Sequence, residues 1–237
     1  MGQYDNFIFY NPNNLPMSSI NIIPSILVPD EKTFLSWSRA VEEVLPMIQL
    51  DIADGEFVEN KTWADPDIVM DKLNIDCELH LMVADPLEEV RFWEEVPQVK
   101  RVLVHYESDP DNIANILSQV QSYGWEVGLV LNPDTPVDVV DDLIEDIDAL
   151  MFMGVVPGKQ GQRFIPETID RIKEAREKFP DLFIELDGAV NEDTLEDIAA
   201  SGVNAVCPGS AIFGNERKPA ENVKRMRELI HRLTEKN

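Results

Sequence analysis

The stretch that decides the fold is Met47-Ile-Gln-Leu-Asp-Ile-Ala-Asp-Gly55, an apolar run that leads into an Asp-x-x-Asp-Gly turn. It predicts a buried strand with Asp51 close to its carboxyl end. The stretch Leu182-Phe-Ile-Glu-Leu-Asp-Gly-Ala-Val190 has the same form and brings Asp187 to the same position. Between the two, a third apolar run carries His80. If these strands are parallel, their carboxyl ends meet at one edge, and two carboxylates and an imidazole converge there.

Apolar runs of this kind recur along the chain and alternate with longer amphipathic segments. Runs that are almost wholly apolar indicate strands buried on both faces, as in a parallel sheet. Eight such strands alternating with eight helical segments predict an α/β fold, a single (β/α)8 TIM barrel. A doubly wound open sheet is the alternative, but no Gly-x-Gly-x-x-Gly follows the first strand. The predicted strands are Ile22–Leu27, Met47–Ile52, Glu78–Met82, Arg101–His105, Glu126–Leu131, Ala149–Met153, Phe183–Asp187 and Ala205–Pro208.

Capping residues and first-turn prolines mark the expected helix starts. We predict a barrel domain over residues 21–237, preceded by an extension over residues 1–20 that shows neither helical nor strand periodicity. No linker or repeat indicates a second domain. The predicted helix starts are Pro29-Asp30-Glu31, Asp85-Pro86, Asp109-Pro110-Asp111, Thr135-Pro136 and Asn191-Glu-Asp193.

The composition is strongly acidic, with 45 Asp and Glu against 20 Lys and Arg and a formal net charge of −25. Nucleic acid is therefore not expected as a partner, because binding to a phosphate backbone needs a basic patch. The acidity fits a high-salt cytoplasm, a cationic partner or simply a well-solvated surface. No apolar run approaches the length of a membrane span, and no signal peptide is evident, so we expect a cytoplasmic protein. Cys77 and Cys207 lie in apolar runs and are expected to be reduced core residues.

Glycines follow the last three predicted strands, and barrels commonly hold a phosphate group with the loops after the seventh and eighth strands and a short helix N-terminus. Gly158 and Gly161 lie in the loop after the sixth strand, Gly188 follows the seventh, and Gly209 and Ser210 follow the eighth. Glycine lets backbone N–H groups approach an anion closely, and a helix start there adds a favourable dipole. The pattern predicts a phosphate site formed by neutral backbone amides, which an acidic surface does not prevent.

Seven ordered motifs, spread from about residue 22 to residue 214, resemble the ribulose-phosphate 3-epimerase family. They cover nearly the whole predicted barrel and are specific as a set. The motifs are Ile23-Pro-Ser-Ile-Leu27, Leu50-Asp-Ile-Ala-Asp-Gly-Glu-Phe-Val58, His80-Leu-Met82, Val130-Leu-Asn-Pro133, Pro157-Gly-Lys-Gln-Gly-Gln162, Leu186-Asp-Gly188 and Gly209-Ser-Ala-Ile-Phe213.

The resemblance implies an isomerase that interconverts D-ribulose 5-phosphate and D-xylulose 5-phosphate. Asp51 and Asp187 match the family's two acid/base aspartates, which remove a proton from carbon 3 and return one to the opposite face. Inversion needs two groups, because a single carboxylate returns its proton to the face from which it came. The resemblance also implies substrate contacts by Ser25, His80, Met82, Met153 and the phosphate-binding segment of Gly158, Gly161, Gly188, Gly209 and Ser210.

The resemblance further implies a divalent metal ion (Zn, Fe, Mn or Co), bound by two histidines and the two aspartates. Asp51, His80 and Asp187 match three of these ligands, but Gln49 stands where the second histidine is expected. A glutamine oxygen can coordinate a hard cation, although it is a poorer donor than imidazole for zinc or iron. Without a metal, two close carboxylates would tend to share a proton. The sequence leaves open whether a metal binds.

Two further departures from the family pattern are Ala53, where a pocket methionine is expected, and Ala189, where a second glycine is expected. Three functions therefore stay open: a pentulose-phosphate 3-epimerase, an epimerase for a hexulose 6-phosphate such as allulose 6-phosphate, and a non-catalytic sugar-phosphate-binding barrel. The resemblance implies a symmetric homo-oligomer. His105 and His231 are expected to have structural roles, with His105 bonding locally.

Overall fold

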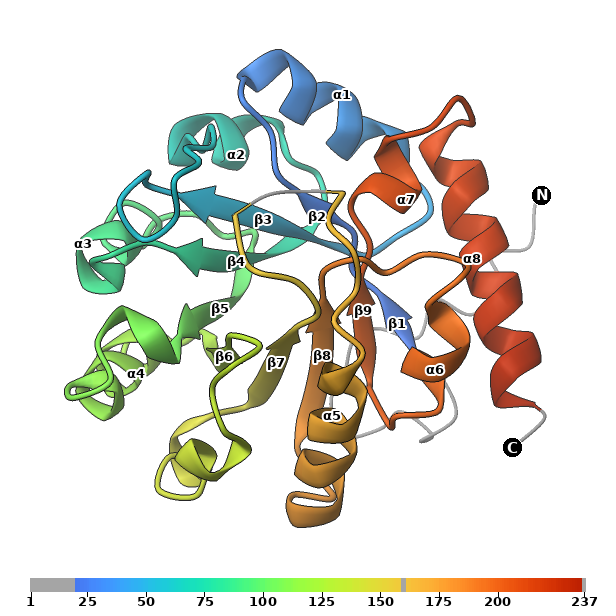
Figure 1. Cartoon of the computed structure of the whole chain (residues 1–237). Coiled ribbons are helices and arrows are strands. Elements are labelled where there is room, and N and C mark those ends of the chain that lie inside the picture. The colour runs from blue at the N-terminus through green and yellow to red at the C-terminus, as the bar shows by residue number, and fades with distance from the viewer. Residues whose placement is uncertain (1–19, 159–160, 236–237) are drawn as a thin grey trace.

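The computed structural model describes residues 20–158 and 161–235, and the predicted extension lies almost wholly outside this range. Its strands form one parallel sheet in the order β1-β9-β8-β7-β6-β5-β4-β3-β2. The two ends of that order meet, because β1 and β2 are separated only by Ile23 and Pro24, and Figure 1 shows the resulting ring. The strands are β1 Asn21–Ile22, β2 Ser25–Ile26, β3 Met47–Ala53, β4 Asp76–Met82, β5 Val99–His105, β6 Glu126–Leu131, β7 Ala149–Met153, β8 Phe183–Asp187 and β9 Ala205–Cys207.

The first predicted strand is thus split in two, with β1 pairing with β9 and β2 pairing with β3. Pro24 lacks a backbone N–H and fits the interruption, while its carbonyl accepts a hydrogen bond from Gln49 N at 3.0 Å. The (β/α)8 TIM barrel expected from the sequence is confirmed.

Helices surround the ring in Figure 1 and cover the outer face of the sheet. Asp30, Asp65 and Asp85 cap α1, α2 and α3 by accepting the backbone N–H three residues on, as a side-chain N-cap requires. The helices are α1 Glu31–Val41, α2 Pro66–Lys72, α3 Pro86–Val90, α4 Ile113–Gln121, α5 Glu167–Lys178, α6 Leu195–Ala199, α7 Ser210–Phe213 and α8 Pro219–Thr234, with a 3-10 helix η1 at Tyr106–Ser108.

One predicted helix is wrong in type. Thr135-Pro136 leads into two short 3-10 helices, η2 at Val137–Val140 and η3 at Ile144–Asp146, where we expected an amphipathic α-helix. Valines lose rotamer freedom in a helix, and this segment adds a series of aspartates, which are also weak helix formers. Two other starts come later than predicted: α4 begins at Ile113 and α6 at Leu195.

The strands are buried on both faces and divide the core into two layers. In β3 all seven residues are buried. Ile48, Leu50 and Ile52 point outward into the large core shared with the helices. Met47 belongs to a smaller core that fills the barrel interior. The alternation of side chains along a strand therefore directs Gln49 and Asp51 inward.

A buried ionic layer lies inside the barrel next to the site residues, formed by side chains such as Glu78 and Glu185, two residues before His80 and Asp187. Arg101 on β5 is 1% exposed and donates to Glu78 on β4 at 3.1 Å and to Glu185 on β8. Its other donors reach Glu126 on β6 at 2.7 and 3.1 Å. These contacts join four strands through one guanidinium group, whose planar fork suits several carboxylates at once.

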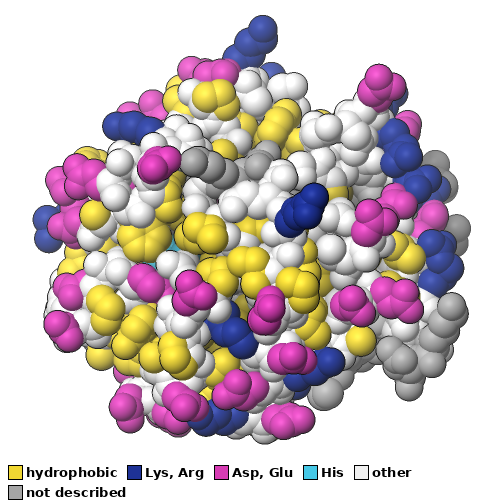
Figure 2. Space-filling view, in the orientation of Figure 1, with side chains coloured by type: hydrophobic (Ala, Val, Ile, Leu, Met, Phe, Trp, Pro, Cys, Tyr) yellow, Lys and Arg dark blue, Asp and Glu magenta, His cyan; other side chains and the backbone are white. Residues whose placement is uncertain are grey.

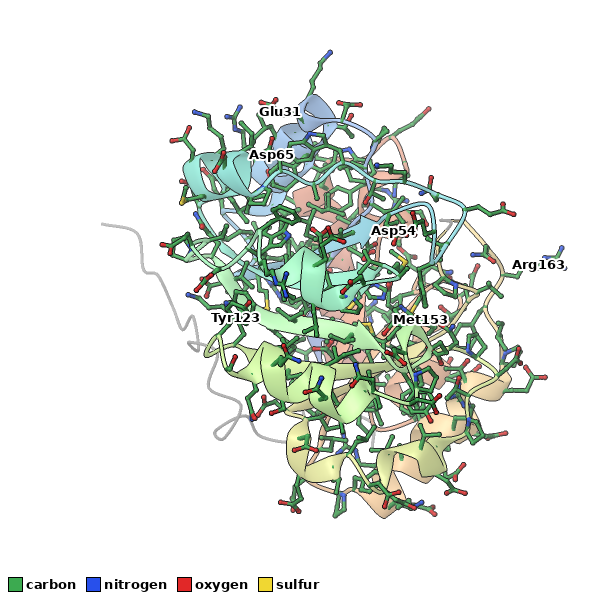
Figure 3. All side chains as sticks on the ribbon, turned by 90° about the vertical axis from the view of Figure 1, so that its left-hand side faces the viewer. Glu31, Asp54, Asp65, Tyr123, Met153 and Arg163 are labelled. Atoms are coloured by element: carbon green, nitrogen blue, oxygen red, sulfur yellow. The ribbon has the colours of Figure 1, made fainter. Side chains whose placement is uncertain are left out.

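The two ends of the barrel are distinct. Figure 3 shows Asp54, just beyond β3, and Met153, the last residue of β7, at one end, and Tyr123, which precedes β6, at the other. Cys77 and Cys207 are free and buried, which confirms the expectation for both. Among the described residues, no helix is long and apolar enough to cross a membrane.

Candidate active site

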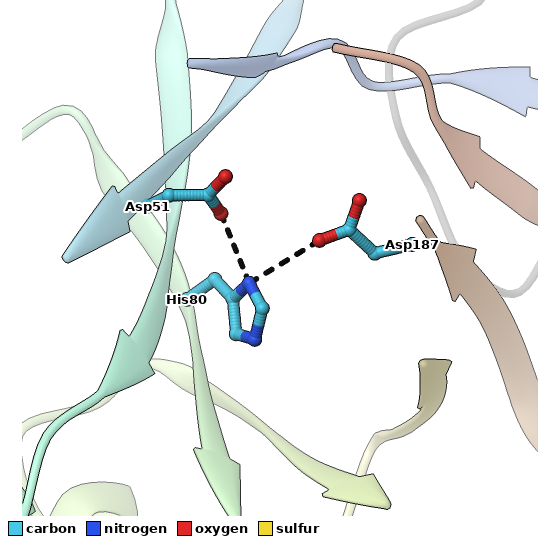
Figure 4. Close-up of side chains that lie close together, drawn as sticks. All are labelled: Asp51, His80 and Asp187. Atoms are coloured by element: carbon cyan, nitrogen blue, oxygen red, sulfur yellow. Dashed lines mark hydrogen bonds and ion pairs between the residues drawn. The ribbon is translucent and has the colours of Figure 1, made fainter. Parts of the chain in front are cut away.

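Three strand ends bring Asp51, His80 and Asp187 together, as the sequence predicts. Asp51 pairs in register with His80 across β3 and β4, and Asp187 is the last residue of β8. His80 Nδ1 lies 2.9 Å from Asp51 Oδ1 and 3.4 Å from Asp187 Oδ2 (Figure 4). All three are buried, with 3%, 0% and 7% of their surface exposed. One imidazole nitrogen therefore faces two carboxylates that come from distant parts of the chain.

Gln49 completes this group; it lies two residues before Asp51 on β3 and therefore on the same, inward face. Its amide nitrogen donates to Asp51 Oδ1 at 2.8 Å and to Asp187 Oδ2 at 3.0 Å, and lies 3.3 Å from His80 Nδ1. Its amide oxygen is buried and has no hydrogen-bond partner among the described residues. The amide thus turns both of its N–H groups toward the aspartates.

His105 and Glu107 extend the group on the far side of His80. His80 Nε2 lies 2.9 Å from His105 Nε2, and His105 Nδ1 lies 3.3 Å from Glu107. Glu107 in turn accepts from the backbone N–H of Asn132 at 2.9 Å and from the Thr135 hydroxyl. The local bond expected for His105 is present as its contact with Glu107, and the contact with His80 is an additional one that was not predicted from the sequence. The position of His105 at a strand end, like that of Asp187, is the pattern from which the contact could have been predicted.

The surroundings of the two imidazoles shift their pKa values in opposite directions. Burial alone would lower the pKa of His80, but hydrogen bonds and charges from Asp187 and Asp51 raise it to about 9. Burial lowers the pKa of His105 to about 4, because its bond to Glu107 compensates only in part. At neutral pH a charged His80 therefore donates to Asp51 and to a neutral His105, which donates to Glu107. Burial and the charge of Asp187 also raise the pKa of Asp51.

A cavity opens beside the aspartates at the strand ends. The carboxyl ends of the strands are where barrels bind small molecules. His80, which we also expected to contact substrate, is fully buried and is not among the lining residues. The predicted site residues that do line the cavity are Ser25, Asp51, Met82, Met153, Gly158, Gly161, Asp187, Gly188, Gly209 and Ser210.

The backbone around the predicted phosphate segment requires glycine at specific positions. Gly188 has φ +104°, and a Cβ there would meet Val155 Cγ2 at 2.7 Å. Gly158 has φ +99°, and a Cβ there would meet the Cβ of Val58 at 2.8 Å. Ala189 follows with φ +54°, the one positive φ of a non-glycine residue in the described chain. A side chain in this conformation is strained, so the alanine carries a cost that glycine would avoid.

Asp51, His80 and Asp187 form a group that can hold a metal ion, with ligand atoms within 4.8 Å of one another. Two carboxylates and an imidazole suit several divalent cations. The Gln49 amide does not fit such an ion as it stands, because its nitrogen is a donor and faces the same three atoms. Its oxygen, the atom that could ligate a metal, has no hydrogen-bond partner in the described part of the chain.

Comparison with known proteins identifies close sequence relatives. The model of the Ribulose-phosphate 3 epimerase family matches residues 21–213. The chain is 32% identical over 225 residues to a ribulose-phosphate 3-epimerase, cytoplasmic isoform, of Oryza sativa subsp. japonica, covering 90% of this chain and 95% of the relative. It is 31% identical over 213 residues to a ribulose-phosphate 3-epimerase of Bacillus subtilis, covering 85% and 96%.

Solved structures with little sequence similarity share the fold. KGPDC from Streptococcus mutans has a TM-score of 0.69 at 12% identity and covers 90% of this chain and 98% of its own. The 3-hexulose-6-phosphate synthase from Salmonella typhimurium has a TM-score of 0.64 at 14% identity and covers 90% and 100%. These similarities support the barrel architecture alone.

Proposed function

Since the chain belongs to the ribulose-phosphate 3-epimerase family, whose members are isomerases, we propose that it interconverts D-ribulose 5-phosphate and D-xylulose 5-phosphate through two aspartates. One observation carries the mechanism: Asp51 and Asp187 both line the cavity although they come from β3 and β8. Their carboxylates share the Gln49 amide as a donor. Two acid/base groups beside one cavity are what inversion at a carbon atom requires.

In the proposed reaction, one aspartate, as a carboxylate, removes the proton from carbon 3. The electrons of the C–H bond move toward the carbonyl at carbon 2 and give an enediolate. The other aspartate, as a carboxylic acid, then donates its proton to carbon 3 from the opposite face. The raised pKa of Asp51 supports this scheme, because it favours holding a proton between the two steps. The positive charge of His80, which lies beside both aspartates, favours the negative charge that develops on the enediolate.

We assign substrate contacts to the cavity residues that the family resemblance named. Ser25, Met82 and Met153 would contact the sugar, and glycine-rich backbone would hold the phosphate. The close approach of the backbone segments that follow β7 and β8 supports the phosphate assignment. Gly154 N donates to Asp187 O, and Gly188 lies against Val155. Cytoplasmic location and a homo-oligomeric state stay predictions. The phosphate-binding segment is Gly158, Gly161, Gly188, Gly209 and Ser210.

Label exchange at carbon 3 tests the mechanism more sharply than turnover alone. Both Asp51→Asn and Asp187→Asn should reduce epimerisation by roughly 10³-fold or more, since each removes one acid/base group. Each variant keeps one base, so it should still exchange the carbon-3 proton of one epimer with deuterated water. Asp148→Asn, at an exposed aspartate that caps the start of β6 by accepting from Val127 N, is the matched control and should retain wild-type rates.

The outcomes separate the functions that the sequence left open. Loss of epimerisation with exchange from opposite epimers in the two variants supports the two-aspartate scheme. Turnover that survives either substitution contradicts it. A wild-type chain that is inactive on ribulose 5-phosphate but active on allulose 6-phosphate would be a hexulose-phosphate epimerase. Binding of both sugars without turnover or exchange would identify a non-catalytic barrel.

A further inference from the structure

We propose that the side-chain amide of Gln49 takes the place of a divalent metal ion between the two aspartates, so that this chain organises its acid/base pair without a metal. The inference rests on the proposed function for the catalytic role of Asp51 and Asp187. The hydrogen-bond arrangement around Gln49 does not depend on that catalytic role. Gln49 is therefore a positioning residue, which acts through the aspartates.

The position of the amide nitrogen carries the inference. Gln49 Nε2 lies 2.8 Å from Asp51 Oδ1, 3.0 Å from Asp187 Oδ2 and 3.3 Å from His80 Nδ1. These are the same three atoms that could ligate a metal. An ion bound by all three would lie against the amide nitrogen, which already donates to two of them. A primary amide has two N–H groups, one for each aspartate, so the nitrogen bridges both carboxylates as an ion would.

The orientation of the amide makes the two arrangements mutually exclusive. Turning the amide over would point its oxygen at the oxygens of Asp51 and Asp187, and three acceptors would then face one another. Only a cation or additional protons between them would relieve that repulsion. With the nitrogen inward, the partial positive charge of the N–H groups satisfies the carboxylates and disfavours a cation. A metal must therefore break both hydrogen bonds before it binds.

Burial makes this exchange costly. Gln49 has no exposed surface, and Asp51 and Asp187 are 3% and 7% exposed. Hydrogen bonds between an amide and buried carboxylates are charge-assisted and stronger than neutral ones. Position 49 sits within β3, whose backbone is paired with β2 and β4 on its two sides. The strand cannot move aside, so the residue at position 49 determines whether the site accepts an ion.

Metal content tests the inference without reference to activity. The wild-type chain, purified from metal-replete cells and dialysed against chelator, should contain well below about 0.1 equivalent of Mn, Fe, Co or Zn by mass spectrometry. Gln49→His restores an imidazole donor and should retain about one equivalent, because a fourth ligand completes the set. Gln98→His is the matched control: Gln98 lies outside the site and donates to Met70 O and Leu73 O. It should gain no metal.

Cobalt supplies a second readout. Added Co²⁺ should give ligand-field absorption bands and a raised melting temperature in Gln49→His but neither in the wild type. An ion raises the melting temperature only if it binds the folded chain. A wild-type chain that retains about one equivalent through chelation, or shows stoichiometric cobalt bands, overturns the inference. If Gln49→His does not fold, as judged by circular dichroism, these wild-type measurements decide alone.

A third variant tests the positioning role. Gln49→Leu has similar size but no N–H group, and should reduce kcat by roughly 10²-fold with little change in KM while remaining free of metal. Unchanged kcat in a folded Gln49→Leu overturns the role. A metal-free chain without epimerase activity would refute the proposed function and leave the amide arrangement intact. An active chain that holds a metal would do the reverse.

Discussion

His105 is the residue whose charge state should limit stability at acid pH. Its pKa is lowered to about 4 by burial, whereas a histidine in an unfolded chain titrates near 6.5. The unfolded chain therefore binds the proton more readily, and the stability that neutral His105 provides is complete above about pH 6.5 and is lost as the pH falls through about 4. His80 behaves in the opposite sense: with a pKa raised to about 9, its contribution is complete below about 6.5 and is lost as the pH rises through 9.

This difference predicts the effect of His105→Gln on acid stability. Between pH 7 and pH 5 the wild type should lose about 2 kcal/mol of unfolding free energy through His105 alone, and the variant should lack that loss. Urea denaturation of both proteins at the two pH values measures the difference, with equal m-values as the control for the unfolded state. An equal loss in wild type and variant would show that another group governs acid unfolding.

Ala189 provides a test of backbone strain beside the cavity. Its φ of +54° costs an alanine about 1–2 kcal/mol. Glycine avoids this strain, but it loses more conformational entropy on folding, which offsets part of the gain. Ala189→Gly should therefore stabilise the protein by about 0.5–1 kcal/mol in urea denaturation. Ala189→Val should destabilise it by more than that, because a β-branched residue tolerates positive φ least. Stabilisation by valine would contradict the strain.

At this scale the sequence was informative about residue type and position but not about orientation. Asp51, His80 and Asp187 could be predicted to converge because each lies at the carboxyl end of an apolar strand. The inward N–H groups of Gln49 could not, since amide orientation depends on acceptors contributed by β3 and β8 together. The bond from His105 to His80 was missed for a different reason: His105 also ends an apolar strand, and its convergence with His80 was not inferred from that position.

At the scale of elements, the Arg101 layer holds β4, β5, β6 and β8 in register from inside the barrel. Burial raises the pKa of both Glu78 and Glu185, and their mutual repulsion adds to this for Glu78. Arg101 is the cation that offsets these charges, with Glu126 as a third, half-buried partner. Removing one partner of a buried ionic group costs more than removing the whole group.

Arg101→Met should therefore lower the unfolding free energy by about 3–5 kcal/mol. The loss should be larger at pH 8 than at pH 5. Without Arg101, the buried carboxyl groups of the folded chain must be protonated to avoid an uncompensated charge, and protonation costs less free energy at the lower pH. The triple variant Arg101→Met, Glu78→Gln and Glu185→Gln should recover most of the loss. Chemical denaturation at both pH values is the measurement, and a triple variant no more stable than Arg101→Met would contradict this account.

The elements themselves were predictable to different degrees. All eight strands were found because each is a run of apolar residues buried on both faces, and that pattern survives any packing detail. The split at Pro24 left the first strand recognisable as a single run. The segment after β6 was mispredicted because its amphipathic pattern is shared by two 3-10 helices, and Asp-rich, Val-rich sequence does not sustain an α-helix. Helix starts shifted where the capping residue closes a turn instead, as Asn191 does by accepting from Asp193 N.

At the scale of the whole molecule, the dominant feature is the net charge of −25. Figure 2 shows acidic side chains around the periphery of the face it displays, with fewer basic ones between them. The cavity is lined mainly by glycines, apolar residues and backbone, with Asp51 and Asp187 as its acidic members. The barrel thus separates a repulsive surface from a site that the proposed function requires to accept an anionic sugar phosphate, and this separation was not predictable from composition.

Self-repulsion of the surface should make stability depend on ionic strength. Folding brings the excess carboxylates closer together than in the extended chain, so screening favours the folded state. The Debye length falls from about 20 Å to about 6 Å between 0.02 and 0.3 M NaCl. Over this range we expect a gain of roughly 1–2 kcal/mol, which for a chain of this length raises the melting temperature by roughly 3–6 °C. Calorimetry at pH 7 measures it, with sucrose of matched osmolality as the control for solute exclusion. A melting temperature that stays constant or falls as NaCl rises would contradict this prediction. It would mean that the stabilisation by surface ion pairs is at least as large as the destabilisation by repulsion among the carboxylates.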